Sequence, residues 1–425
     1  MAKALILQIS GEEYNFKLQE YFYIFIKAIY NEQAGSRIMK IAMIGQKGIP
    51  SRTSGIDIHV EELSKRLVYL GYEVEAYCIK NYCDKVFINM KYAGIDIRYT
   101  HFLKLKHLST LAYTFVSTIK ALRSKCDIFH YHALGPSSLA FIPRLFGKKV
   151  VCTVHGLDWQ KEVYGRLAIK YLKFGEFATA KFANKTINVS KNLVKYYRDK
   201  YNLETDYIPN GIDRPDILKL NVIRQKYNLE PQGYILFLSR LAPEKGVHYL
   251  IKAYNQIVTN KKLVIAGGTN SPDYYENQLK DMAKNNNIIF TGFVRDQELA
   301  ELYSNAYFYV LPSDVEGLPI SLLEAMSYGN CCLVSDIPEN IAVIGTMGYE
   351  FEKSNVDDLV IKLNMLLQNE NKVLNVKKFS GDYIIRKYNW DQITIKTSNI
   401  YKRLYSKNKS KNLNAKSENR ATNIY

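Results

Sequence analysis

Two glutamates, Glu316 and Glu324, have the types and spacing of a carboxylate pair that could hold a polar ligand. They are separated by seven residues that include Gly317 and Pro319. The apolar run 307–311 upstream predicts a strand, and the apolar residues downstream suit one face of a helix. Because proline is favoured in a first helical turn, we expect Glu316 in a strand-to-helix loop and Glu324 on the helix, about 800° further round at 100° per residue and so on a similar face. Such a pair can hold sugar hydroxyls of a sugar nucleotide, and the helix N-terminus can hold its phosphates.

A second candidate group is cationic. Arg240 and Lys245 follow the predicted strand 234–238. An arginine and a lysine delivered at the C-terminal end of a strand are well placed to bind a diphosphate and to stabilise the charge of a departing nucleotide diphosphate without a metal. No Asp-x-Asp pair stands in a suitable loop, so we expect no metal site. A solvated lysine is the alternative interpretation of Lys245.

Two further segments follow predicted strands. His155 and Gly156 come after the strand 150–154, and a loop with Gly48 and Gly55 follows the strand 41–44. Glycines let backbone N–H groups approach a phosphate or a sugar. The loop has neither the dinucleotide-binding pattern nor the Walker pattern. A structural histidine and an ordinary turn are the alternatives.

Composition and charge limit the possible classes. The chain has 425 residues, 47% hydrophobic and 23% charged, which suits two globular domains. Residues 1–205 carry +14 of the net charge of +17, which favours an anionic partner such as lipid headgroups, lipid diphosphates or nucleic acid, or else a solvated lysine-rich surface. The segment 98–108, where basic residues alternate with apolar ones, could dock on an anionic leaflet.

No apolar run reaches the length of a membrane span, and no signal peptide is evident. The six cysteines form no disulfide-like ladder and are expected to be reduced thiols. We therefore expect a cytoplasmic protein, either free or peripheral at the inner face of the cell membrane.

The remaining pattern is an alternation of short β-branched runs and helical segments, in two series. The predicted strands are 41–44, 74–79, 95–99, 128–131, 150–154 and 186–189, then 234–238, 263–266, 288–290, 307–311 and 331–334. Alternation of this kind predicts parallel sheets covered on both faces, and two series predict an α/β protein with two doubly wound, Rossmann-like domains that face a cleft.

The expected domains are an N-terminal one at 39–206 and a C-terminal one at 207–388. A helix is expected at 389–405, and a basic tail at 406–425 would be disordered. Residues 1–38 are aromatic and fit neither domain. They are either a membrane-surface helix or an extension before a true start at position 39, and we favour the second.

Taken together, these segments resemble the retaining GT-B glycosyltransferases of family 4, in particular the rhamnosyltransferase-like enzymes of bacterial surface polysaccharide assembly. The resemblance covers about residues 39–405. It rests on the first strand and helix with Gly-Gln-Lys-Gly-Ile-Pro, on Val154-His-Gly-Leu-Asp-Trp159, on Ser239-Arg-Leu-Ala-Pro-Glu-Lys-Gly246 and on Glu316-x7-Glu324.

The resemblance implies that the domain at 39–206 is on the acceptor side, that the domain at 207–388 binds the donor, and that the helix at 389–405 crosses back to the first domain. It also implies roles for individual residues. Arg240 and Lys245 would bind the donor diphosphate, Glu316 the donor sugar, Glu324 the nucleotide ribose, and His155 would lie beside the donor sugar at the reacting face. The other implied donor-binding positions are Gly48, Gly55, Val294, Gly317, Leu318, Pro319 and Ile320.

One departure from the family pattern concerns the loop before the first helix. The family's Gly-Gly-Ile-Glu is replaced by Ser54-Gly55-Ile56-Asp57. Donor or acceptor positioning could therefore differ in this chain.

The resemblance implies front-face transfer from a nucleotide-sugar, UDP- or dTDP-linked, to a saccharide or lipid-linked acceptor in cell-surface polysaccharide synthesis, with no cofactor and no metal. A UDP-sugar 2-epimerase of the same architecture is one alternative, although it needs acid–base residues around the sugar C2. A non-catalytic anion- or nucleic-acid-binding protein is the other, but no recognised nucleic-acid module or stacking platform supports it, so we expect no nucleic-acid partner.

Overall fold

The computed structural model describes residues 38–50, 54–82, 91–100, 109–161, 164–269, 274–284 and 286–421. The N-terminal extension up to residue 37, residues 51–53 of the loop before the first helix, and most of the basic segment 98–108 lie outside the described residues.

The chain forms two compact units. The first contains the described residues up to His130, residues 142–150 and the chain from Tyr401 onward, and the second contains residues 131–141 and 151–400. The expected domain boundary at 206/207 lies inside the second unit. The reason is visible in the core: Val154, Leu172 and Tyr197 belong to the same hydrophobic cluster as the buried strands after residue 230.

The first sheet has eight strands in the order β3-β4-β2-β1-β5-β6-β7-β8. Pairing between β1 and β2, β2 and β4, β6 and β7, and β7 and β8 is parallel, while β3 is antiparallel to β4. The strands are β1 Lys40–Ile44, β2 Glu73–Ile79, β3 Lys91–Tyr92, β4 Ile95–Thr100, β5 Ile128–His132, β6 Lys149–Val154, β7 Lys185–Asn188 and β8 Asp206–Tyr207. All six strands expected in this half of the chain are present; β3 and β8 were not expected.

The helices that alternate with these strands follow local sequence signals. The helix α7 shows this well: Ser190 caps its first turn by accepting the N–H of Leu193, and Asn202 ends it in the left-handed conformation. The helices are α2 Gly55–Tyr69, α3 Ser109–Arg123, α4 Leu134–Ser137, α5 Phe141–Leu145, α6 Arg166–Lys181 and α7 Lys191–Tyr201.

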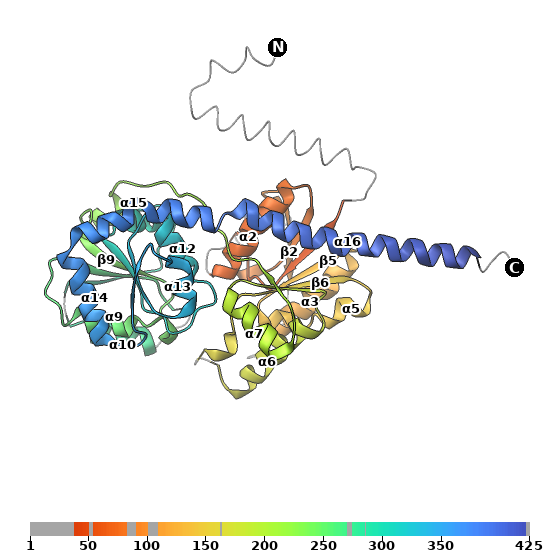
Figure 1. Cartoon of the computed structure of the whole chain (residues 1–425), viewed down its shortest axis with the longest axis horizontal. Helices are drawn as coiled ribbons and strands as arrows, with labels where there is room; N and C mark the ends of the chain where they lie inside the picture. Colours follow the sequence, from red (N-terminus) through yellow and green to blue (C-terminus); the bar gives the residue numbers. More distant parts are fainter. Residues whose placement is uncertain are drawn as a thin grey trace, which may run out of the picture. The chain divides into compact units, whose positions relative to one another are not determined.

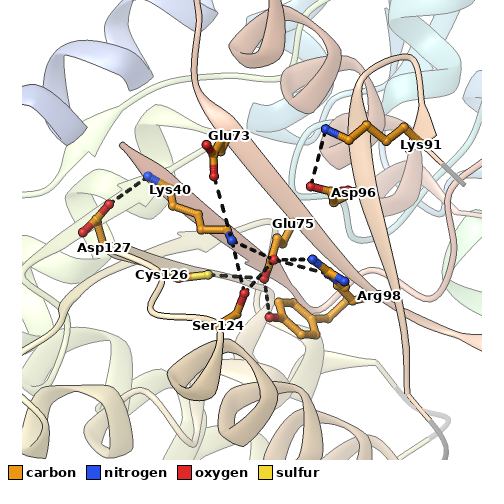
Figure 2. A network of polar contacts seen from close by, with 10 residues as sticks. Lys40, Glu73, Glu75, Lys91, Asp96, Arg98, Ser124, Cys126 and Asp127 are labelled. Atoms are coloured by element: carbon orange, nitrogen blue, oxygen red, sulfur yellow. Dashed lines mark hydrogen bonds and ion pairs between the residues drawn. The ribbon is translucent and has the colours of Figure 1, made fainter. Parts of the chain in front are cut away.

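A buried glutamate ties the strands of the first unit together (Figure 2). The fully buried side chain of Glu75 on β2 accepts hydrogen bonds from Tyr77 at 2.7 Å and Ser124 at 2.7 Å, and it pairs with Lys40 at 3.1 Å and Arg98 at 2.9 Å. Although burial opposes ionisation, these partners lower the pKa of Glu75 to about 2. The charge therefore links β1, β2, β4 and the turn after α3.

The second sheet has the order β11-β10-β9-β12-β13-β14, and its strand pairs are parallel. Helices surround it, with α9, α10 and α14 gathered on one side (Figure 1). The strands are β9 Tyr234–Leu238, β10 Lys262–Ala266, β11 Ile288–Gly292, β12 Phe308–Leu311, β13 Cys332–Ser335 and β14 Tyr349–Phe351. The helices are α8 Val222–Tyr227, α9 Val247–Tyr254, α10 Tyr274–Met282, α11 Asp296–Asn305, α12 Ile320–Ser327, α13 Pro338–Ile344, α14 Val356–Gln368 and α15 Glu370–Lys387. The architecture is thus α/β with two doubly wound sheets.

The last helix, α16, runs from Trp390 to Ala421. Ile393, Ile400 and Leu404 are buried along it. This helical range includes residues 406–421, for which the sequence predicted a disordered tail, and no glycine or proline stands among them. Among the residues that the structure describes, no helix has the length and apolarity needed to span a bilayer.

Candidate functional site

Glu316 lies in the loop between β12 and α12, as its sequence context predicts. Its Oε1 accepts a hydrogen bond from Ser313 Oγ at 2.8 Å and pairs with Lys245 Nζ at 2.5 Å. The Lys245 and Glu316 side chains are only 12% and 7% exposed. The structure therefore brings two of the predicted site residues into one nearly buried ion pair.

Backbone contacts fix the loop that carries Glu316. The N–H of Asp314 donates to the carbonyl of Glu244 at 2.9 Å, and Ser335 Oγ donates to the carbonyl of Ser313. Gly246 has a φ of +68°, and a Cβ there would lie 1.9 Å from the carbonyl oxygen of Pro312. Glycine is thus required next to Lys245, both for the backbone conformation and for space.

Gly317 and the segment at His155 approach each other as backbone. A Cβ on Gly317 would lie 1.8 Å from the carbonyl oxygen of His155 and 3.1 Å from the Cα of Gly156. Only glycine fits such a close approach. The structure therefore places His155, which follows β6, beside the loop of Glu316.

The His155 ring has a histidine neighbour. Its Nε2 lies 3.2 Å from Nδ1 of His132, the last residue of β5, and the ring centroids are 5.5 Å apart. Of these two ring nitrogens, one carries a proton and donates it to the other, so the tautomer of each histidine depends on that of its neighbour. Sequence reasoning missed His132, although its position at the carboxyl end of a parallel strand was the available signal.

Arg240, at the end of β9, is half-exposed, with its side chain 44% accessible and 3.7 Å from the carboxylate of Glu244. Lys161, which sequence reasoning also missed, pairs with Asp158 at 2.5 Å. Burial and then Asp158 raise the pKa of Tyr164, while the charges of Lys161 and Arg240 oppose the rise. The two cations therefore act on the same phenol, which places Lys161 in the neighbourhood of Arg240.

A buried network orients the segment after His155. Trp159 Nε1 donates to the fully buried carboxylate of Glu176 at 2.6 Å. The same carboxylate accepts from Lys200 and Tyr201, each at 2.6 Å, and from Tyr196 at 3.0 Å. The turn that carries Lys161 is thereby anchored to α6 and α7. Glu176 carries no sequence signal beyond being a helix glutamate.

Glu324 lies on α12, as predicted, and Tyr303 Oη donates to its Oε2 at 3.2 Å. Tyr309 on β12 is fully buried; burial raises its pKa most, and Glu316 and Glu324 both raise it further. The two carboxylates therefore lie near one buried phenol. The helix begins at Ile320, and Pro319 stands just before it as the N-cap rather than inside the first turn.

Two further donor-binding candidates, Val294 and Leu318, lie in loops that follow strands of the second sheet. Val294 is partly buried in the turn between β11 and α11, whereas the neighbouring Phe293 is 55% exposed. Leu318 is buried at 9% exposure in the loop after Glu316.

Gly48 and Gly55 belong to the first unit, and the two residues that depart from the family pattern, Ser54 and Asp57, lie at the start of α2. Ser54 caps α2 by accepting the N–H of Asp57 at 3.3 Å, and Asp57 accepts the N–H of Lys47 at 2.7 Å. Ser54 and Asp57 therefore stabilise the N-terminus of α2.

These residues could bind an anionic, hydroxyl-rich ligand. Lys245 and Arg240 supply positive charge, Glu316 and Glu324 supply hydroxyl acceptors, and the start of α12 supplies N–H groups.

Two family models match the chain. Glycosyltransferase Family 4 matches residues 53–214, and Glycosyl transferases group 1 matches residues 221–380. Together the two matches cover most of the chain and, with the two doubly wound sheets, they support a glycosyltransferase of the GT-B fold.

Individual proteins agree with this class. The chain is 28% identical to an uncharacterized glycosyltransferase of Methanocaldococcus jannaschii, over 86% of this chain and 98% of the other. It is 24% identical to the UDP-Gal:alpha-D-GlcNAc-diphosphoundecaprenol alpha-1,3-galactosyltransferase of Escherichia coli, over 86% and 93%. The structure of sucrose-phosphate synthase from Thermosynechococcus elongatus matches with a TM-score of 0.75 at 20% identity, over 87% of this chain and 99% of the other, which supports the fold.

Proposed function

We propose that this glycosyltransferase moves a hexosyl or deoxyhexosyl group from a UDP- or dTDP-linked donor to a saccharide or lipid-linked acceptor, with retention of configuration, in cell-surface polysaccharide synthesis. The observation that carries the proposal is the Lys245–Glu316 pair at 2.5 Å, held in a loop whose Gly317 lies against His155. The similarity to an enzyme whose name specifies a UDP-linked donor and a diphosphoundecaprenol acceptor supports this choice of substrates. We also propose that the chain belongs to the rhamnosyltransferase-like subgroup of these enzymes.

In the proposed mechanism the residues of this chain bind and orient. Arg240 and Lys245 bind the donor diphosphate and stabilise the charge that develops on it as the glycosidic bond breaks. Glu316 holds hydroxyls of the donor sugar, and Glu324 holds the ribose. His155 lies at the reacting face of the sugar.

The proton of the acceptor hydroxyl passes to an oxygen of the leaving phosphate. The acceptor attacks from the face that this phosphate vacates, so configuration is retained. Neither step requires a side chain of the protein to act as the base.

The alternatives make different predictions. A UDP-sugar 2-epimerase would invert the sugar at C2 without consuming an acceptor. A nucleic-acid-binding protein would bind RNA with an affinity that falls steeply with salt. Neither alternative is favoured by the family matches.

A donor screen tests the proposal. Thermal shift is measured with UDP, dTDP and GDP, and transfer is measured with the corresponding sugars and a lipid-diphosphate saccharide. We expect UDP or dTDP to raise the melting temperature, and transfer to continue in EDTA. Activity that EDTA abolishes and Mg²⁺ or Mn²⁺ restores would contradict the metal-independent mechanism.

A further inference from the structure

Helix α6 exposes large apolar side chains beside cations. Leu167, Phe174 and Phe177 are 83%, 46% and 43% exposed, and Lys170 and Lys181 are exposed on the same helix. At 100° per residue these five positions fall within an arc of about 80°. They form one stripe along the helix, which we name the α6 face.

The opposite side of α6 is held in place. A Cβ on Gly175 would lie 1.9 Å from the carbonyl oxygen of Leu134, so the helix approaches α4 closely. The buried Glu176 pairs with Lys200 at 2.6 Å. These contacts fix the rotation of α6, and the α6 face must therefore point away from the core.

The exposed charged side chains of α6 all have the same sign. Its only acidic residue is Glu176, which is fully buried. Its exposed charges are all positive, and they are Arg166, Lys170, Lys173 and Lys181.

Aromatic side chains extend the apolar surface beyond the end of the helix. The ring centroids of Phe174 and Phe177 are 6.4 Å apart, those of Phe177 and Phe182 are 6.1 Å apart, and those of Phe182 and Phe141 are 5.8 Å apart. This row joins α6 to the start of α5. Phe174 and Phe177 are exposed, whereas Phe182 and Phe141 are partly buried. Exposed apolar groups that adjoin further aromatic rings in this way mark an interaction surface.

We propose that the α6 face docks on an anionic lipid bilayer. Apolar and aromatic side chains on a helix that lies in the membrane interface enter the headgroup region, and lysines beside them contact lipid phosphates. The positive charge without exposed acids matches an anionic leaflet, whereas a protein partner would have to be similarly acidic and apolar. The α6 face does not include the basic segment 98–108 considered from the sequence, which lies largely outside the described residues.

The docking goes beyond the proposed function, because it can be measured without turnover. If the donor screen fails while vesicle binding behaves as described below, the docking surface stands without the proposed function. If transfer to a soluble acceptor succeeds while vesicles are not bound, only the docking surface fails.

The chain offers a matched control on α15. Leu374 and Phe379 are 48% and 51% exposed there, and Lys372 and Lys378 are exposed nearby. The double variants Lys372→Glu/Lys378→Glu and Leu374→Ser/Phe379→Ser therefore change charge and apolar area as the α6 variants do, at a different surface.

The experiment is co-sedimentation of the full chain with vesicles of phosphatidylglycerol and phosphatidylcholine, and with phosphatidylcholine alone. We expect binding to the anionic vesicles at low salt and release at high salt. Because each cation near the surface is worth about a fivefold change in partitioning, Lys170→Glu/Lys181→Glu should weaken binding at least about 25-fold. Leu167→Ser/Phe174→Ser should also weaken it, and the α15 variants should bind within about twofold of wild type.

Three results would overturn the proposal. The first is equal binding to neutral and anionic vesicles. The second is an equal loss in the α6 and α15 variants. The third is self-association of the wild type, measured by light scattering, that the α6 substitutions abolish while vesicle binding is unchanged. Circular dichroism of each variant shows that the fold is retained.

Discussion

Replacing Glu316 by glutamine tests the ion pair at the proposed centre. The change keeps the shape of the side chain and removes its charge, so that Lys245 Nζ, which lies 2.5 Å from Glu316 Oε1, faces a neutral amide. Both side chains are almost completely buried, and removing one partner of such a pair costs about 3–5 kcal/mol. If about 3 kcal/mol of this cost falls on the bound transition state, kcat/KM decreases by roughly 100-fold or more.

The assay is steady-state transfer with the donor that the wild type prefers, together with thermal unfolding of each variant. Glu350→Gln, an exposed position on β14, makes the same charge change elsewhere and should leave kcat/KM unchanged. If Glu316→Gln fails to fold, Glu316→Asp retains the charge but shortens its reach, and it should also lower kcat/KM. A folded Glu316→Gln variant with kcat/KM within about threefold of wild type, a barrier change below ~0.7 kcal/mol, would refute the assigned role.

Three further predictions concern single residues. Lys245→Ala should lower kcat by at least about 100-fold, because it removes positive charge from the leaving group, whereas Lys252→Ala on the exposed side of α9 should have little effect in the same assay. Gly317→Ala should also lower kcat/KM strongly, since its Cβ would lie 1.8 Å from the His155 carbonyl oxygen; wild-type activity would show that the close approach is not needed. The pKa of Glu75 is lowered to about 2, so its ionisation stabilises the fold fully above about pH 4.5 and the contribution is lost as pH falls toward 2. Glu75→Gln should therefore reduce the free energy of unfolding by up to about 3 kcal/mol at pH 7, and in urea titrations the difference from wild type should shrink below pH 4; a difference independent of pH would contradict the ionic origin.

Much of the fold was predictable because buried parallel strands are short runs of apolar, β-branched residues. The strands 234–238 and 263–266 were predicted in nearly the observed places. The two-residue strands β3 and β8 and the three-residue β14 were missed, since so short a segment shows no periodicity.

The candidate site was predictable where charged residues follow the ends of strands. Arg240, Lys245 and Glu316 all follow strands of one sheet, and the structure brings Lys245 and Glu316 together. His132 was missed although it ends a parallel strand, because its partner His155 is distant in sequence. Lys161 was missed because Arg240, whose charge acts on it, is also distant in sequence.

The start of α12 at Ile320 is a further feature that the sequence did not fully determine. Proline fits both an N-cap and a first-turn position, so the sequence alone could not decide the role of Pro319. The tail beyond residue 406 is another, because a lysine- and asparagine-rich composition predicts disorder while an uninterrupted helix can continue through it.

The most direct test of the central claim is the anomeric configuration of the transfer product. The full chain is incubated with a UDP- or dTDP-linked sugar and a lipid-diphosphate saccharide, and the new linkage is analysed by NMR. We predict one new glycosidic bond with the same anomeric configuration as the donor, and its loss in the folded Glu316→Gln variant. A product of inverted configuration, or C2 epimerisation of the donor without transfer, would contradict the account.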